Sequence, residues 1–168
     1  MLIKAKETNG INFFNGDFET YGTKGWIPYK GTSSDIPTSP FTPSTKLSIV
    51  SSGNDPLFGS SSGLISKASG DARGEGVYFD FTIDEGVKNS IQKISFYYKT
   101  NNDYVDYDII AYIIDENSNT IDMLPLTKNV DVSVVTKIIK FSSSKAYKLY
   151  FHVASINPIE YQIKVDEI

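Results

Sequence analysis

The feature that most constrains this chain is an alternation of apolar and polar side chains, which begins at Val77 and recurs toward the C-terminus. Successive side chains of a β-strand point to opposite faces, so this alternation predicts strands that bury one face. No segment shows the period of an amphipathic helix, and at most one helical turn fits residues 84–90. The alternating segments are residues 77–83, 93–99, 104–114, 120–124, 134–141, 147–154 and 159–166.

Shorter strands are predicted in the first half of the chain, between loops rich in Ser, Gly and Pro. The segments are residues 11–14, 25–29, 47–50 and 64–67, and the long loop 31–45 contains three prolines. About eight to ten short strands at this spacing favour a sandwich or a jelly roll. We therefore expect an all-β fold, an antiparallel β-sandwich of the jelly-roll type.

The length of 168 residues allows one domain with a proper core and is short for two. We expect a single β-sandwich domain over residues 11–168. Residues 1–10 are polar, and we expect them to form an N-terminal arm or a short edge strand.

Composition argues against several classes of site and partner. The absence of cysteine rules out disulfides and thiolate metal sites. A formal net charge of −4 with scattered basic residues argues against a nucleic-acid groove, which needs concentrated positive charge. No apolar run has the length of a membrane helix, and none before Asn15 resembles a signal peptide. We expect no nucleic-acid or membrane partner, and a protein that works inside the cell or leaves it by assembly or lysis.

No catalytic constellation stands out. Asp106 and Asp108 share one face of a predicted strand, about 7 Å apart, which would suit a carboxylate pair, but a solvated strand face explains the same pattern. His152 is the single histidine, and no Gly-x-Ser-x-Gly elbow or phosphate-binding loop accompanies it. We therefore predict no catalytic residues and no enzymatic activity, and interpret His152 as an outward polar residue or a ligand contact.

Calcium is the cofactor that the sequence favours, because loops supply the oxygen ligands that it prefers. Suitable carboxylates stand in the turn at residues 15–19 and in the last predicted strand, namely Asp17, Glu19 and Asp166. They could share one structural site if the two ends of the chain meet in the sandwich. Alternatively, Asp17 is an Asx-type turn residue and Asp166 a charged edge residue.

Sugar binding needs aromatic surfaces and polar side chains that read hydroxyl groups. Positions opposite the apolar stripes supply both, so one of these faces could bind a glycan or a protein partner. Alternatively, the tyrosines pack under loops or against a neighbouring subunit. Trp26 stands beside the apolar Ile27 and is expected in the core. The face positions are Tyr97, Tyr104, Asp106, Asp108, Tyr112, Tyr150 and His152.

Several stretches carry a family resemblance: NGDFE at 15–19 followed by Gly25-Trp26, GEGVYF at 74–79, ISFYYK at 94–99, YKLYFHVAS at 147–155 and IKVDEI at 163–168. The first three resemble carbohydrate-binding modules with the galactose-binding-like jelly-roll fold. The last two are similar to a version of that fold in bacteriophage virion proteins. The resemblance spans nearly the whole chain, and it implies a structural calcium at the three carboxylates named above.

Two functions follow as hypotheses. The first is a non-catalytic structural or decoration protein of a phage virion, in the head, tail or a fibre. It would be assembled in the host cytoplasm, and its partners would be other virion proteins, further copies of the chain or cell-surface glycans. The alternative is a secreted carbohydrate-binding module, free-standing or part of a glycoside hydrolase.

Overall fold

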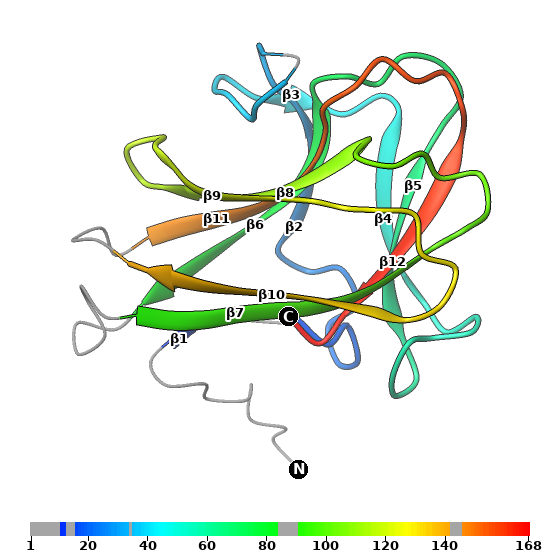
Figure 1. Ribbon diagram of the computed structural model, residues 1–168, viewed down its shortest axis with the longest axis horizontal. Coiled ribbons are helices and arrows are strands. Elements are labelled where there is room, and N and C mark those ends of the chain that lie inside the picture. Colours follow the sequence, from blue (N-terminus) through cyan, green and yellow to red (C-terminus); the bar gives the residue numbers. More distant parts are fainter. Residues whose placement is uncertain (1–10, 13–15, 34, 84–90, 142–145) are drawn as a thin grey trace.

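The computed structural model describes residues 11–12, 16–33, 35–83, 91–141 and 146–168 (Figure 1). Every regular element in these ranges is a strand, which confirms the all-β prediction. None of these residues belongs to a helix with the length and apolar character needed to cross a membrane. The arm predicted for residues 1–10 and the helical turn considered for residues 84–90 lie outside the described residues. The assignment of residues 11–168 to one domain stays a prediction.

Two antiparallel sheets, here called sheet A and sheet B, form a β-sandwich of the jelly-roll type (Figure 1). Sheet A contains, in spatial order, β3 (Thr42–Pro43), β2 (Trp26–Lys30), β6 (Glu75–Ile83), β11 (Ala146–Val153), β8 (Ile109–Asp115) and β9 (Thr120–Pro125), with β1 (Ile11–Asn12) beside β6. Sheet B contains β10 (Ser133–Lys140), β7 (Ile91–Thr100), β12 (Tyr161–Asp166), β5 (Ser62–Lys67) and β4 (Leu47–Ser52).

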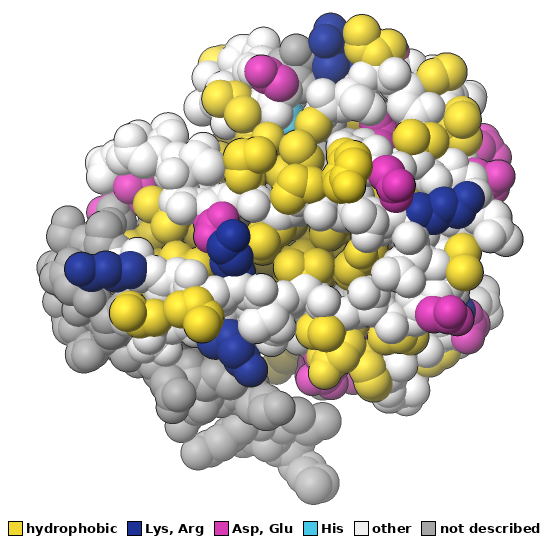
Figure 2. All heavy atoms as spheres, in the orientation of Figure 1, with side chains coloured by type: hydrophobic (Ala, Val, Ile, Leu, Met, Phe, Trp, Pro, Cys, Tyr) yellow, Lys and Arg dark blue, Asp and Glu magenta, His cyan; other side chains and the backbone are white. Residues whose placement is uncertain are grey.

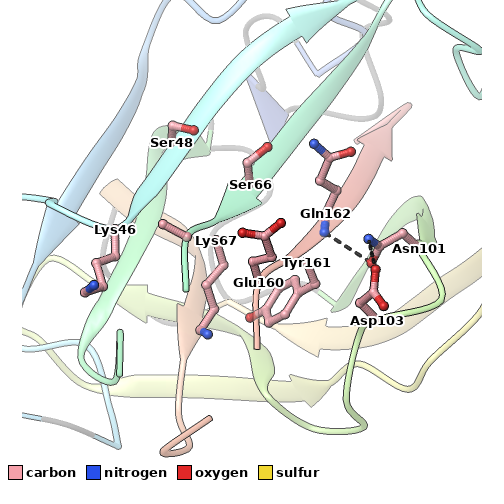
Figure 3. A pocket seen from close by; sticks show the side chains of 10 residues that line it. Lys46, Ser48, Ser66, Lys67, Asn101, Asp103, Glu160, Tyr161 and Gln162 are labelled. Carbon is pink, nitrogen blue, oxygen red and sulfur yellow. Dashed lines mark hydrogen bonds between the residues drawn. The ribbon is translucent and has the colours of Figure 1, made fainter. Parts of the chain in front are cut away.

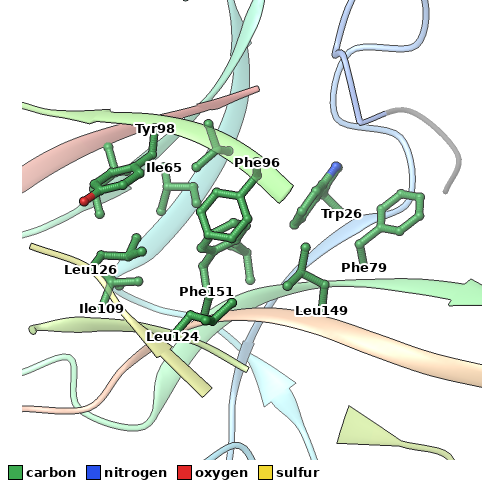
Figure 4. Close-up of a cluster of buried hydrophobic side chains, with 14 of the residues drawn as sticks. Trp26, Ile65, Phe79, Phe96, Tyr98, Ile109, Leu124, Leu126, Leu149 and Phe151 are labelled. Carbon is green, nitrogen blue, oxygen red and sulfur yellow. The ribbon is translucent and has the colours of Figure 1, made fainter. Parts of the chain in front are cut away.

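The core lies between the two sheets and is made of the inward positions of the alternating segments (Figure 4). Phe79 on β6 and Phe151 on β11 face Phe96 on β7 and Ile163 on β12, and none of these side chains is more than 3% exposed. The rings of Phe96 and Phe151 meet edge to face across the sheets, with centroids 5.2 Å apart. Burial of each such side chain contributes about 1.5–3 kcal/mol, so these contacts hold the sandwich together.

The two ends of the described chain meet at the turn that precedes Trp26. The Ile168 amide donates to the Gly16 carbonyl over 3.2 Å, and Figure 1 shows the red C-terminal segment beside the blue one. Trp26 is 5% exposed, and its ring lies 5.6 Å from that of Phe18 and 5.2 Å from that of Phe79. Trp26 is therefore a core residue, as the sequence predicts.

Candidate functional site

The residues predicted on outward faces lie in different parts of the sandwich, so they do not all belong to one glycan or partner face. Tyr104 and Asp108 are 2% and 0% exposed. The reason is local: β8 begins at Ile109, and the preceding residues form a turn with Tyr107 at a φ of 65°. Asp106 is exposed and accepts a hydrogen bond from the Lys128 amide over 2.5 Å.

The turn is fixed by two buried polar groups. The Tyr104 hydroxyl donates to the Leu126 carbonyl (3.1 Å) and accepts from the Ile109 amide (3.0 Å). The Asp108 carboxylate accepts from the Ser155 hydroxyl and, over 3.3 Å, from the Asn157 amide group. These bonds satisfy buried groups that would otherwise be costly, and they replace the strand that the alternation predicts for residues 105–108.

Three predicted face residues, Tyr112, Tyr150 and His152, do lie together on the outer face of sheet A. They pair across β8 and β11, but none is more than 2% exposed. The Tyr29 hydroxyl lies 2.6 Å from Nδ1 of His152, and its ring centroid lies 5.4 Å from that of Tyr150. His152 therefore has the outward strand position predicted for it, but neighbouring side chains cover it.

The loop that precedes β4 supplies the cover. The Phe41 ring meets Tyr29 edge-on at 4.8 Å, and the Tyr112 hydroxyl donates to the Asp35 carbonyl over 2.9 Å. Burial raises the pKa of the Tyr112 hydroxyl, which keeps it protonated as a donor. The prediction that tyrosines pack under a loop is correct here. We call Tyr29, Phe41, Tyr78, Tyr112, Tyr150 and His152 the aromatic cluster.

Tyr97 is the remaining predicted face residue, and it belongs to sheet B. It is half-buried, and its ring meets that of Phe58 edge-on with centroids 4.7 Å apart. Phe58 comes from the loop between β4 and β5, which folds over this end of the sheet. Tyr97 thus lies apart from the aromatic cluster and shares no surface with it.

The carboxylates predicted to hold calcium bind the protein itself. Glu19 accepts from the Ser60 and Ser61 amides over 2.7 and 3.1 Å. Asp166 accepts from the Ser62 hydroxyl over 2.8 Å and is 1% exposed.

Asp17 accepts from the Glu19 amide over 3.2 Å, as in an Asx turn. Among the described residues, no three acidic or histidine side chains gather to hold a metal ion. Binding of calcium stays a prediction from the sequence.

Asp166 should make the stability of the protein depend on pH. Burial raises its pKa to about 6 from an ordinary value of 3.8, although hydrogen bonds from Ser62, Glu167 and Phe58 oppose the rise. Between these values the folded state binds more protons than the unfolded state, so the free energy of unfolding falls as pH rises. Asp166→Asn should remove this slope, worth on the order of 1–2 kcal/mol after solvent screening.

The measurement is urea denaturation of wild type and Asp166→Asn from pH 3.5 to 7.5. The stability of the wild type relative to the variant should decline between about pH 4 and 6 and be flat above that range. A difference that rises with pH in this window would mean that the native state favours the ionised carboxylate.

An open groove of about 480 Å³ lies on the outer face of sheet B (Figure 3). Ser48, Ser66 and Gln162 stand in a row, because β4, β5 and β12 pair in that register. Asn101 and Asp103 form one wall. The Asn101 side-chain oxygen accepts from the backbone amide of Gln162 over 3.2 Å, and the side-chain amide group of Asn101 donates to the Asp103 carboxylate. We call this site the polar groove; Glu160, Lys46, Lys67, Ala68 and Tyr161 complete its lining.

The side chains of the polar groove can both donate and accept hydrogen bonds. Hydroxyl, amide and carboxylate groups offer both donors and acceptors, as sugar hydroxyls require. The aromatic ring in the lining, that of Tyr161, is 2% exposed and offers no stacking face. Lys67 is also 2% exposed, and its ammonium group donates to the Asn157 and Ile159 carbonyls over 2.6 and 2.7 Å. Lys67 therefore supports one end of the groove.

Sequence reasoning missed the polar groove because its residues belong to separate segments. Ser48, Ser66 and Gln162 are ordinary outward strand positions when each is taken alone. The signal that could have found them is the pairing of β5 with both β4 and β12, which the alternation does not specify.

No protein-family model matches the sequence, and no curated protein matches it. Solved structures do match the fold. The C-terminal family 22 carbohydrate-binding module of Clostridium thermocellum Xyn10B is 15% identical, with a TM-score of 0.57 over 96% of this chain and 93% of that one. A xylan-binding domain of the same module family is 14% identical, with a TM-score of 0.55 over 94% and 93% of the two chains.

A third similar structure is the enzymatically active domain of tailspike protein 4 from bacteriophage CBA120. It is 16% identical with a TM-score of 0.58, and the match covers 93% of this chain but 21% of that chain. At these identities the similarity shows the fold alone: the chain has the jelly-roll sandwich of carbohydrate-binding modules.

Proposed function

We propose that this protein is a non-catalytic carbohydrate-binding domain whose ligand lies in the polar groove. The observation that carries the proposal is the row of outward hydroxyl and amide side chains on β4, β5 and β12, opposite the wall of Asn101 and Asp103. Such a set can donate hydrogen bonds to several hydroxyl groups of one sugar chain and accept hydrogen bonds from them. The open groove favours a chain that enters along the sheet.

The similar structures support the ligand class. Two of them are carbohydrate-binding modules, and one of these is described as xylan-binding. The aromatic cluster is the other surface with sugar-binding residue types, but its tyrosines are closed over by loop 31–45. The polar groove therefore accounts better for binding in the described conformation.

The test is affinity electrophoresis in gels that contain soluble xylan or, for comparison, other polysaccharides. Ser66→Ala/Gln162→Ala should weaken retention about tenfold, because roughly 1.4 kcal/mol of hydrogen bonding is lost. Asn117→Ala is the matched control, since it removes an exposed amide in the turn between β8 and β9. Absence of retention on every polysaccharide would refute the proposal, and equal retention of the double variant and wild type would exclude the groove.

A phage virion component is the second candidate, and the similarity to a tailspike domain supports it. In that case the sandwich would be one domain of a larger assembly, and glycan binding would serve attachment. Mass spectrometry of purified virions from the source phage would detect the chain if it is a virion component, and its absence would count against this candidate.

A further inference from the structure

Strand β10 forms one edge of sheet B and presents an apolar row to solvent. Val132, Val134 and Ile138 are 48%, 51% and 69% exposed, and Ile91 on the neighbouring β7 is 67% exposed. Among the described strands, only β7 hydrogen-bonds to β10, so the other edge of β10 has no strand partner, although β9 contacts β10 through Asp122 and Lys137. Figure 2 shows hydrophobic side chains along this side of the molecule. An exposed edge of this kind is a template for another strand.

The charges along β10 are distributed by sign. Asp131, just before the strand, is acidic, whereas the second half of the strand carries Lys137 and Lys140. Lys137 already pairs with Asp122 on β9 over 3.4 Å, which leaves Lys140 as the exposed basic end. A strand with an acidic start and a basic end is complementary to an antiparallel copy of itself.

We propose that β10 pairs antiparallel with β10 of a second copy of this chain, which joins the two B sheets across a two-fold axis. The axis passes through Thr136, so that Val134 of each copy lies opposite Ile138 of the other. This register pairs the exposed apolar side chains, which is the arrangement that stabilises adjacent antiparallel strands. The interface is isologous and closes at two copies.

The charges fit the same register. With Thr136 on the axis, Lys140 of one copy lies opposite Val132 of the other, one residue from Asp131. At each end of the paired strands a basic and an acidic residue are therefore close in position, with Asp131 in the bend just before the strand, whereas a parallel pairing would place like charges at the same end.

Two other edge strands, β4 and β9, are less suited to this role. On β4, the opposite edge of sheet B, Val50 stands among Ser48, Ser51 and Ser52 and is 49% exposed. On β9, one edge of sheet A, the register with β8 shifts at Ile113 and Ile114. Irregular edges resist further pairing.

The test is sedimentation velocity of the full chain over a concentration series, with wild type and two matched variants. Val134→Lys should weaken self-association at least tenfold, because each lysine would replace an apolar contact with Ile138 of the other copy and lie diagonal to its Lys140. Val50→Lys places the same charge at nearly equal exposure on the opposite edge strand and should leave self-association unchanged. A wild type that remains monomeric to about 1 mM, or equal weakening by both variants, would overturn the proposal.

A cross-link tests the register independently. The chain has no cysteine, so Thr136→Cys introduces a single thiol. Directly opposite side chains in antiparallel strands have Cβ atoms about 4.5–5.5 Å apart, close to disulfide range. Oxidation should give a covalent dimer with Thr136→Cys and not with Ser48→Cys on the opposite edge; the reverse result, or equal yields, would overturn the register.

Discussion

Replacement of Glu75 by alanine should lower the free energy of unfolding by about 3–5 kcal/mol. Glu75 stands at the start of β6, is 1% exposed, and receives four hydrogen bonds from the segment before β4. The donors are the Ser44 and Thr45 hydroxyls and the Thr45 and Lys46 amides, at 2.5–3.0 Å. Without the carboxylate these four donors would lose their shared acceptor, so the segment that connects sheets A and B would lose its anchor.

The carboxylate also sets a pH dependence with a definite sign. Burial would raise the pKa of Glu75, but the hydrogen bonds from Ser44, Lys46 and Thr45 outweigh it and hold the pKa below its ordinary value of 4.5. The stabilisation is therefore present above pH 4.5 and is lost as pH falls below it. This is the opposite of the trend predicted for Asp166.

Urea denaturation at pH 7 measures the effect. Glu75→Gln should lose less than Glu75→Ala, since an amide oxygen can still accept from the two backbone amides. Glu116→Ala is the control, because Glu116 is exposed in the turn between β8 and β9. A loss below about 1 kcal/mol in Glu75→Ala would show that the segment is held by other contacts.

Most of the strands could be predicted because alternation is a local signal. The failures have physical causes that alternation does not encode. At residues 105–108 the pattern continues, but the buried Tyr104 hydroxyl and Asp108 carboxylate form hydrogen bonds that fix a turn. The short edge strand β3 was missed because it contains Pro43, which lacks an amide hydrogen and usually marks a loop.

The candidate site could be predicted only in residue type. Outward polar and aromatic positions can be recognised from the sequence, but which of them meet depends on strand order and on how loops fold back. Tyr112, Tyr150 and His152 do meet, as expected from their shared outward parity, yet loop 31–45 closes over them. A sequence does not show that a proline-containing loop will cover a sheet face, because that cover comes from contacts such as Phe41 on Tyr29.

Gly76 explains how the aromatic cluster can be closed, and Gly76→Ala should lower the free energy of unfolding by roughly 2–4 kcal/mol. Gly76 pairs with Tyr29 on one side and with His152 on the other. An added Cβ would lie 2.5 Å from the Phe151 carbonyl oxygen and 2.8 Å from the Tyr29 ring. Only glycine leaves room for that ring to lie across β6.

The clash with the Phe151 carbonyl and the clash with the Tyr29 ring would relax in different ways, so an experiment can tell which of them causes the destabilisation. The Phe151 carbonyl belongs to β11 and can recede only if β6 and β11 part, whereas the Tyr29 ring can swing out and give up its contact with His152. Gly53→Ala is the control, since that exposed glycine would meet one carbonyl at 3.1 Å. His152 is the single histidine, so its imidazole NMR signals report the outcome without assignment. Gly76→Ala should both destabilise the fold and shift those signals. A destabilised variant with unchanged signals would place the strain between β6 and β11 alone. Unchanged stability would refute the close approach to Gly76.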